Sequence, residues 1–144
     1  MKISKVRDVK TPERGTPRSA GIDFFVPSKF QPTHLSPGES ILIPSGIRVD
    51  VPENHVLIAY NKSGIASKKS LYVGACVVDE DYQGEVHINL INNGQYAVEI
   101  EPDMKIVQFL LLPINYSLPE LVEDEHLFSE ITKRGKGGFG STGV

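Results

Sequence analysis

Hydrophobic residues occur in short runs along the chain, and prolines and glycines separate these runs. Ser40–Val51 ends with aliphatic residues at every second position, Ile47, Val49 and Val51. This period of two is typical of a strand with one buried face. Similar runs predict further strands at His55–Tyr60, Leu71–Val78, Glu85–Ile91 and Lys105–Ile114. Many short strands between frequent turn signals favour an all-β sandwich or barrel.

Three segments depart from the strand pattern. Ser63–Lys69 predicts one short helix with Ser63 as its N-cap. Ser117–Lys133 is acidic and has no clear period, whereas residues 134–144 are rich in glycine and predict a flexible tail. No internal repeat or second-domain boundary is visible. We therefore predict a single domain over residues 1–144, with a β core at 1–133 and a tail at 134–144.

Composition narrows the class of protein. The 144 residues are 40% hydrophobic and 23% charged, as expected for a globular chain. The net charge of -3 argues against the broad basic surface of a stable nucleic-acid binder. Cys76 is the single cysteine, which fits a reducing compartment. No apolar run approaches the ~18 residues of a membrane span, and the start of the chain lacks the apolar region of a signal peptide. We expect a cytoplasmic protein without membrane contact, in the host cytoplasm if the source is viral.

The tail carries groups that suit a nucleotide. Its glycines expose backbone N–H groups, Arg134 adds positive charge, and Ser141 and Thr142 add hydroxyl donors. Phe139 lies among glycines, where its ring can stack on a base. Composition alone favours the alternative, a disordered terminus, by a small margin.

An acidic segment, Val77–Glu85, interrupts the apolar runs. Asp79, Glu80 and Asp81 lie together, and the pattern predicts a β-hairpin with its turn near Glu80–Tyr82. Carboxylates at a turn are commonly just solvated. The functional alternative is that one carboxylate activates a water molecule, and this segment alone does not decide between the two.

Three more places in the sequence hold candidates for a site. Lys62, Ser63 and Gly64 precede or begin the predicted helix, where a cation, a hydroxyl and backbone N–H groups together suit an anion. The simpler alternative is a capped surface helix. Asp23 lies in an apolar strand, and the sequence favours a structural carboxylate over one that holds a metal-bound water. Gln108 interrupts an apolar strand, so a site-facing role and a core hydrogen bond are equally compatible with its position.

Together these segments resemble the five ordered motifs of the trimeric dUTPase family. The motifs are AGIDF at 20–24, NKSGIA at 61–66, GACVVDEDYQGEV at 74–86, KIVQFLLLP at 105–113 and RGKGGFGSTG at 134–143. The resemblance covers nearly the whole chain, and the tail motif is the most specific. It implies a jelly-roll-like β fold, a homotrimer with active sites shared between subunits, and Mg²⁺-dependent hydrolysis of dUTP to dUMP and pyrophosphate. Such an activity limits uracil in DNA and supplies dUMP for dTMP synthesis.

The resemblance also implies a role for each candidate residue. Asp79 would be the general base that directs water at the α-phosphate, and Tyr82 would pack under the deoxyribose. Asp23 would help to position Mg²⁺ through water, with the ion held mainly by the triphosphate. The remaining residues would bind substrate: uracil by the backbone of Cys76, Val77 and Val78 and by the ring of Phe139, and the phosphates by Lys62, Ser63, Gly64, Gln108, Arg134, Gly140, Ser141 and Thr142.

Two positions depart from the family pattern. Lys62 replaces an arginine, which keeps the charge but loses the bidentate fork. Cys76 replaces a glycine in the base-binding segment, which bears on base specificity. The alternatives are a dCTP deaminase or bifunctional deaminase–diphosphatase of the same fold, which needs a proton-transferring glutamate such as Glu80 or Glu85, and a non-catalytic nucleotide-binding regulator.

Overall fold

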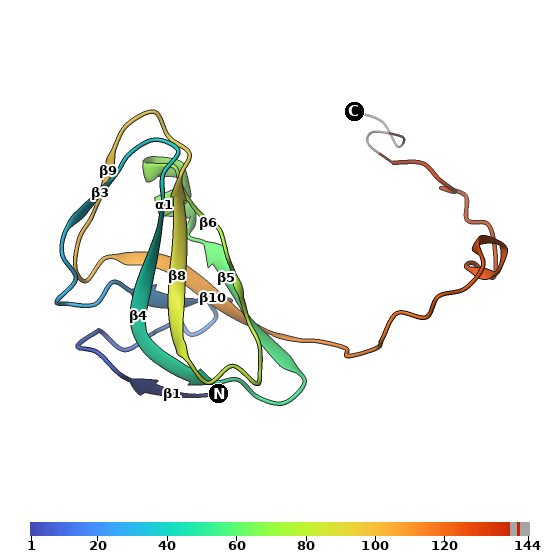
Figure 1. The fold of residues 1–144 in the computed structure, drawn as a ribbon, viewed down its shortest axis with the longest axis horizontal. Coiled ribbons are helices and arrows are strands. Elements are labelled where there is room, and N and C mark those ends of the chain that lie inside the picture. The colour runs from blue at the N-terminus through green and yellow to red at the C-terminus, as the bar shows by residue number, and fades with distance from the viewer. Residues whose placement is uncertain (139–140, 142–144) are drawn as a thin grey trace.

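The computed structural model describes residues 1–138 and 141, and its body consists of antiparallel sheets (Figure 1). The first sheet has the order β1 (Lys2–Lys5), β4 (Ser40–Asp50), β8 (Glu85–Asn92) and β6 (Leu71–Val73). The second has the order β2 (Ile22–Phe25), β10 (Lys105–Pro113), β5 (His55–Asn61) and β7 (Val77–Val78). A small two-stranded sheet pairs β3 (Thr33–Leu35) with β9 (Val98–Ile100).

Both four-stranded sheets contribute to one hydrophobic core. Ile43 and Ile88 come from the first sheet, and Phe24 and Phe109 come from the second; all four are at most 1% exposed. The rings of Phe24 and Phe109 pack with centroids 4.4 Å apart. The all-β, jelly-roll-like prediction is confirmed, in the form of a sandwich whose sheets do not close into a barrel.

Strong hydrophobic periodicity located the long strands well. β4, β5, β8 and β10 begin at the predicted residues and end within one residue of the predicted ends. In β8 the alternation is visible in the burial pattern: Val86, Ile88 and Leu90 are buried, whereas His87 between them is exposed. Side chains that alternate between core and solvent fix the register of a strand, and this makes such strands predictable.

The predicted strand Leu71–Val78 is wrong in one respect, because the chain changes sheets in its middle. β6 pairs with β8 in the first sheet, whereas β7 pairs with β5 in the second. The change occurs next to Gly74, where a Cβ would overlap the Asn89 side chain. The amide oxygen of Asn89 accepts the N–H of Ala75 at 2.9 Å, which holds the crossing in place.

The expected hairpin around Asp79 is corrected for the same reason. Its turn is present, since the Tyr82 N–H donates to the Asp79 carbonyl at 3.2 Å. The strands on either side, β7 and β8, nevertheless belong to different sheets. The turn therefore bridges the two layers of the sandwich.

Helix α1 (Ser63–Lys69) has the predicted bounds, but its cap differs. Lys62 is the N-cap and makes no side-chain capping bond, so Ser63 is the first helical residue. The hydroxyl of Ser63 is consequently not the cap that the sequence predicted. At the other end, Ser70 adopts the left-handed conformation, and its N–H donates to the Ala66 carbonyl.

The chain after β10 runs away from the β body (Figure 1). In residues 114–138, here called the C-terminal arm, the regular structure is one 3₁₀ turn, η1 (Asp124–His126). The arm exposes large apolar side chains, including Leu118, Leu121 and Ile131, which are 90–99% exposed. Within residues 1–138 and 141, no helix has the length and apolar character to cross a membrane.

Candidate active site

The turn Asp79–Tyr82 presents the candidate base at one end of β7. Asp79 follows directly after β7, which pairs with β5 through Val78 opposite Leu57. The neighbouring Glu80 carboxylate accepts the backbone N–H of Asn54, a residue with positive φ (60°). This contact ties the turn to the β4–β5 connection and limits its motion.

β7 is the edge strand of its sheet, and this leaves backbone groups directed outward. The Ala59 N–H donates to the Cys76 carbonyl at 2.8 Å, whereas Val77 stands opposite Ile58. Hydrogen-bonded and non-hydrogen-bonded pairs alternate along an antiparallel ladder. The N–H and C=O of Val77 therefore point away from β5, where a flat ligand with a donor and an acceptor can pair with them. The carbonyl of Cys76 is already engaged in the sheet.

A pocket of about 210 Å³ lies beside this edge. Five predicted site residues line it together: Cys76, Val77, Val78, Asp79 and Tyr82. The buried ring of Phe109 also lines the pocket, and this mixed apolar and polar lining suits a nucleobase.

Tyr116, at the start of the C-terminal arm, lies against the same turn and lines a second hollow with Asp79, Glu80 and Asp81. Desolvation of its hydroxyl, followed by a hydrogen bond to Glu80, raises the pKa of Tyr116 to about 12. The Tyr116 phenol thus lies beside three carboxylates of the turn.

A second cluster of predicted residues surrounds Asp23, on the adjoining ends of β2, β10 and β5. The Lys62 Nζ lies 2.7 Å from the Asp23 Oδ1, and the Lys105 Nζ lies 3.4 Å from the Oδ2. Asp23 is only 4% exposed, so the two cations compensate a carboxylate that has lost most of its water. Lys105 also pairs with Glu13 at 3.0 Å, and this bond, with Asp23 adding to it, raises the pKa of Lys105.

Gln108 joins this cluster through strand register. It lies opposite Asp23 on one side and Tyr60 on the other. Its Nε2 donates to the Asn61 carbonyl at 2.8 Å, immediately before Lys62 and the start of α1. The sequence had left a core bond and a site-facing role equally open. The structure places the side chain, partly exposed, beside the predicted anion-binding segment.

For the dUTP hydrolysis that the sequence resemblance implies, we expect Gly21→Ala to lower kcat/KM by about 10-fold, because small displacements of a positioning group are costly. A Cβ at Gly21 would overlap the Gln108 side chain and push its amide away from Asn61. Gly15→Ala is the matched control, since its Cβ would meet only Ser19 at an ordinary 3.6 Å. Steady-state kinetics of both variants check this. Equal kinetics for the two variants would contradict it.

The two clusters lie at opposite ends of β5 in one chain. Asp79 is placed next to the start of β5, and Lys62 follows its last residue, Asn61. The register places Asp79 beside Val56, so six positions along the strand, at ~3.3 Å each, separate it from Lys62 by roughly 20 Å. The cluster that contains Asp79 and the cluster that contains Lys62 are thus not adjacent within one chain.

Residues of the tail lie apart from both clusters. Arg134 bonds locally, its Nε donating to the Gly137 carbonyl at 2.9 Å, and the Ser141 N–H donates to Gly138. Figure 1 shows that the arm leading to them extends away from the body. The predicted residues Phe139, Gly140 and Thr142 lie outside the described residues.

Sequence reasoning missed several residues next to the candidates. Lys105 is the charged first residue of an otherwise apolar strand, and this contrast could have identified it as a candidate site residue. Leu42 and His87 line the pocket from β4 and β8. They could not be located from the sequence because they reach the pocket only through sheet packing. Tyr116 lies in a segment without periodicity, which offered no signal.

Comparison with known proteins gives a consistent result. The dUTPase family model matches residues 7–143. The chain is 37% identical over 138 residues to the deoxyuridine 5'-triphosphate nucleotidohydrolase of Francisella philomiragia, covering 94% of this chain and 90% of that protein. The proteins of the same name from Chlamydia pneumoniae and Mus musculus are 40% and 39% identical, covering 92% of this chain and 90% and 77% of theirs.

Solved structures agree with the sequence relatives. The dUTPase of Staphylococcus bacteriophage 80alpha with dUpNHpp superposes with a TM-score of 0.84 at 27% identity, covering 99% of this chain and 98% of that chain. A mutant dUTPase of S. aureus phage phi11, described for its coordination of a structural Mg(II) ion, gives a TM-score of 0.73 at 25% identity. It covers 88% of this chain and 97% of its own.

Proposed function

Because the chain belongs to the dUTPase family, we propose that it hydrolyses dUTP to dUMP and pyrophosphate in a homotrimer with shared active sites. The observation that carries the proposal is the family match over residues 7–143, which includes the pocket edge with Asp79 and the cluster around Gln108. The proposed compartment of the enzyme is the cytoplasm.

Asp79 is the proposed general base. Its carboxylate accepts a proton from a water molecule while the water oxygen bonds to the α-phosphorus. The bond from this phosphorus to the bridging oxygen breaks, and pyrophosphate leaves with the electron pair. General-base assistance contributes about 10²–10⁴-fold, so much of the rate must come from positioning and charge neutralisation.

Base selection is proposed to rest on the edge of β7. The outward N–H and C=O of Val77 can pair with one arrangement of donor and acceptor on a pyrimidine. Cytosine reverses these groups at position 4, and an unpaired buried polar group costs about 1–3 kcal/mol. Cys76 lines the same pocket, so its side chain contributes to the shape that the ring meets.

Three features support the shared site. The first is the separation of the Asp79 turn and the Lys62 cluster at opposite ends of β5. A base on one chain and phosphate-binding residues on another can meet when two subunits pack side by side. Placing them on separate chains removes the roughly 20 Å gap that one chain imposes.

The second feature is an apolar row on the outer face of the second sheet. Leu110, Ile58 and Val77 stand opposite one another on β10, β5 and β7, so their side chains share one face. Val77 is 59% exposed, and Tyr60 on the same face of β5 is 44% exposed. A second copy of the chain is the proposed cover for this face.

The third feature is the C-terminal arm. Its Leu118, Leu121 and Ile131 are almost fully exposed in the single chain. Apolar side chains on an extended segment gain free energy when they pack against a neighbouring subunit. Such packing would carry Arg134 and Ser141 from one chain to a site on another.

Mg²⁺ is the proposed cofactor, and it would neutralise charge on the triphosphate. Within residues 1–138 and 141, no group of three or more His, Cys, Asp or Glu side chains is arranged so that it could hold a metal ion. Mg²⁺ bound to a nucleotide is usually held mainly by phosphate oxygens and water. Asp23, engaged by Lys62 and Lys105, would act on it only through water.

The deaminase alternative requires a glutamate available for proton transfer. Glu80 accepts the Asn54 N–H, and Glu85 is held by Arg7 and Gly46. The bond from Arg7, above all, lowers the pKa of Glu85, which favours its ionised form. Both carboxylates have structural partners, so the geometry favours the hydrolase.

A nucleotide panel tests the function. We expect purified protein with Mg²⁺ to cleave dUTP at least about 10²-fold more efficiently than dCTP, dTTP or UTP, since each mismatch costs a polar or steric contact. The products should be dUMP and pyrophosphate, identified by chromatography. Release of orthophosphate would contradict attack at the α-phosphorus, and uracil-containing product from dCTP would favour the deaminase. Addition of EDTA should abolish turnover.

A further inference from the structure

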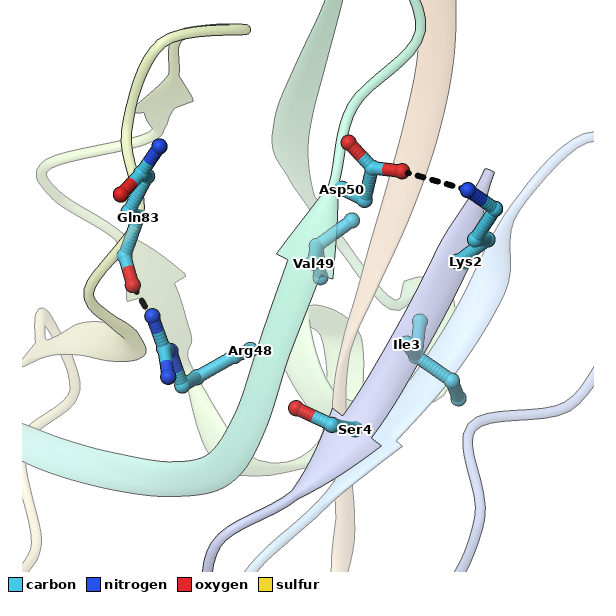
Figure 2. A pocket seen from close by; sticks show the side chains of 7 residues that line it. All are labelled: Lys2, Ile3, Ser4, Arg48, Val49, Asp50 and Gln83. Carbon is cyan, nitrogen blue, oxygen red and sulfur yellow. Dashed lines mark hydrogen bonds and ion pairs between the residues drawn. The ribbon is translucent and has the colours of Figure 1, made fainter.

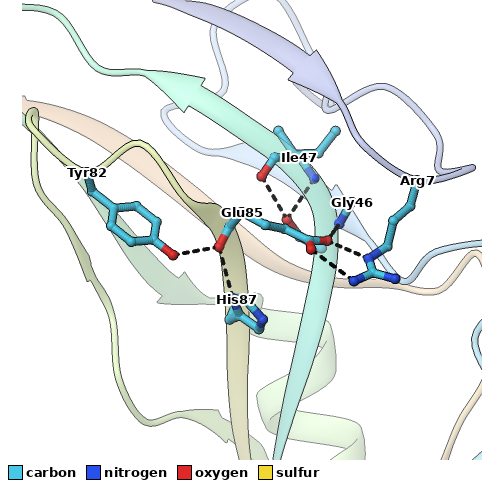
Figure 3. Close-up of polar contacts among 7 residues, drawn as sticks. Arg7, Gly46, Ile47, Tyr82, Glu85 and His87 are labelled. Carbon is cyan, nitrogen blue, oxygen red and sulfur yellow. Dashed lines mark hydrogen bonds and ion pairs between the residues drawn. The ribbon is translucent and has the colours of Figure 1, made fainter.

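Glu85 is located where the Asp79 turn rejoins the first sheet, and its carboxylate is fully engaged. Its Oε1 accepts the Arg7 Nε at 2.7 Å, and its Oε2 accepts the Nη2 at 3.0 Å. The Gly46 N–H donates to the Oε1 at 2.7 Å (Figure 3). The side chain is only 16% exposed. This shielded bidentate pair, strengthened by a backbone N–H, differs from an ordinary surface ion pair.

The backbone carbonyl of Glu85 holds the candidate sugar-binding residue. The Tyr82 hydroxyl donates to this carbonyl at 2.8 Å, and the His87 Nδ1 contacts it at 2.9 Å (Figure 3). The phenol lies directly against Gly84, where a Cβ would overlap the hydroxyl. The Tyr82 hydroxyl is therefore held by the Glu85 carbonyl, and the lack of a side chain at Gly84 lets the phenol lie this close to the backbone.

The backbone of Tyr82 is hydrogen-bonded to the backbone of Asp79. Its N–H donates to the Asp79 carbonyl at 3.2 Å, so both residues belong to one four-residue turn. Arg48, opposite Glu85 in the β4–β8 register, donates to the Gln83 carbonyl at 2.7 Å (Figure 2). A shift of Glu85 would consequently move Tyr82 and, through the turn, Asp79.

We propose that Glu85 is a positioning residue: clamped by Arg7 and Gly46, it holds the Tyr82 ring and the Asp79 turn in one fixed relative arrangement. The inference rests on the proposed function, in which Tyr82 packs under the deoxyribose and Asp79 directs water. It assigns a task in substrate discrimination to the N-terminal segment through Arg7, which is 78 positions away from Glu85.

Backbone geometry explains why the clamp forms at this place. Gly46 has a positive φ of 76°, and β4 loses its regular register with β8 between Pro44 and Arg48. The irregularity turns the Gly46 N–H toward Glu85 instead of toward a ladder partner. A Cβ at Gly46 would press on Arg7 and Val9, so glycine also permits the close approach of the N-terminal segment.

The test compares discrimination between dUTP and UTP. Glu85→Ala should lower kcat/KM for dUTP by about 10- to 100-fold, the cost of a misplaced catalytic group. It should also reduce the ratio of kcat/KM for dUTP over UTP by about 10-fold, because a loosened Tyr82 no longer excludes the 2′-hydroxyl. Glu85→Gln keeps one oxygen to accept from Gly46 and the Arg7 Nε but places an NH₂ group against the Arg7 Nη2, so its loss of discrimination should be smaller than that of Glu85→Ala.

A double-mutant cycle separates positioning from general stability. Tyr82→Phe removes only the hydroxyl that reaches Glu85. If Glu85 acts through that bond, the double variant should lose about as much discrimination as the worse single variant, and not the product of the two losses. Independent, multiplying losses would overturn the proposal. Arg7→Ala supplies the same test if Glu85→Ala does not fold, since it removes the clamping guanidinium without changing the identity of residue 85.

Lys2→Ala is the matched control, because it removes an ion pair from the same sheet. Lys2 lies 3.5 Å from Asp50, with side chains 89% and 69% exposed (Figure 2). Its kinetics and discrimination should equal those of the wild type. A folded Glu85→Ala trimer with wild-type discrimination would refute the role of Glu85. A wild-type protein that fails to hydrolyse dUTP would instead refute the proposed function itself.

Discussion

Asp79→Asn should bind substrate but turn it over about 10²–10⁴-fold more slowly than the wild type, the range that general-base assistance supplies. The amide keeps the size of the carboxylate, and the contacts of the turn with Tyr82 involve only the Asp79 backbone. Binding should therefore survive while kcat falls. Calorimetric titration with dUpNHpp measures the first quantity, and steady-state hydrolysis of dUTP measures the second.

Asp81→Asn is the matched control, because it removes the same charge from the same turn. Asp81 is exposed and two residues from Asp79. Its kcat should stay within about threefold of the wild type, since surface charges contribute little. If both variants lost activity equally, the negative charge of the turn as a whole would be responsible, and the assignment of Asp79 as the base would be wrong.

Truncation after Lys133 should leave an assembled trimer with at least about 10²-fold lower kcat/KM for dUTP. The loss follows because the variant lacks the cation, hydroxyls and aromatic ring proposed to bind the phosphates and the base. In the described part of the tail, Arg134 donates a hydrogen bond to Gly137 and Ser141 donates one to Gly138, so both contacts are local. Light scattering reports the assembly, and steady-state kinetics report the loss. Dissociation into monomers would contradict the expectation.

Mixing two inactive variants tests whether sites are shared. The truncated chain retains Asp79, and full-length Asp79→Asn retains the tail. If each site combines the two from different subunits, co-refolded mixed trimers should recover a substantial fraction of wild-type activity, whereas each variant refolded alone should not. No recovery in trimers shown by mass spectrometry to be mixed would place the base and the tail in one chain.

The local pattern of the sequence predicted the long strands and the short helix because their causes are local. The alternation in β8 is created by neighbours two positions apart, and it is visible without knowledge of the partner strand. The same logic failed at Gly74, because the change of sheets depends on the Asn89 side chain fifteen positions later. It failed again at Ser63, where backbone geometry made Lys62 the N-cap.

The sequence pointed to candidate site residues where a residue type was unusual in its segment. Asp79 stood out in an apolar run, and Gln108 interrupted a strand. The partners of such residues were not predictable. Lys62 and Lys105 reach Asp23 across 39 and 82 positions, and strand pairing alone brings them together.

The sequence by itself determined the strand content, the helix and, through five ordered motifs, the family and its reaction. Periodicity and motif order are properties of neighbouring residues, so they survive without coordinates. Only the tertiary structure decided that the Asp79 turn bridges two sheets, that Lys62 and Lys105 pair with Asp23, and that Arg7 clamps Glu85. These contacts join distant positions through sheet pairing, and pairing is selected by the packing of the whole core.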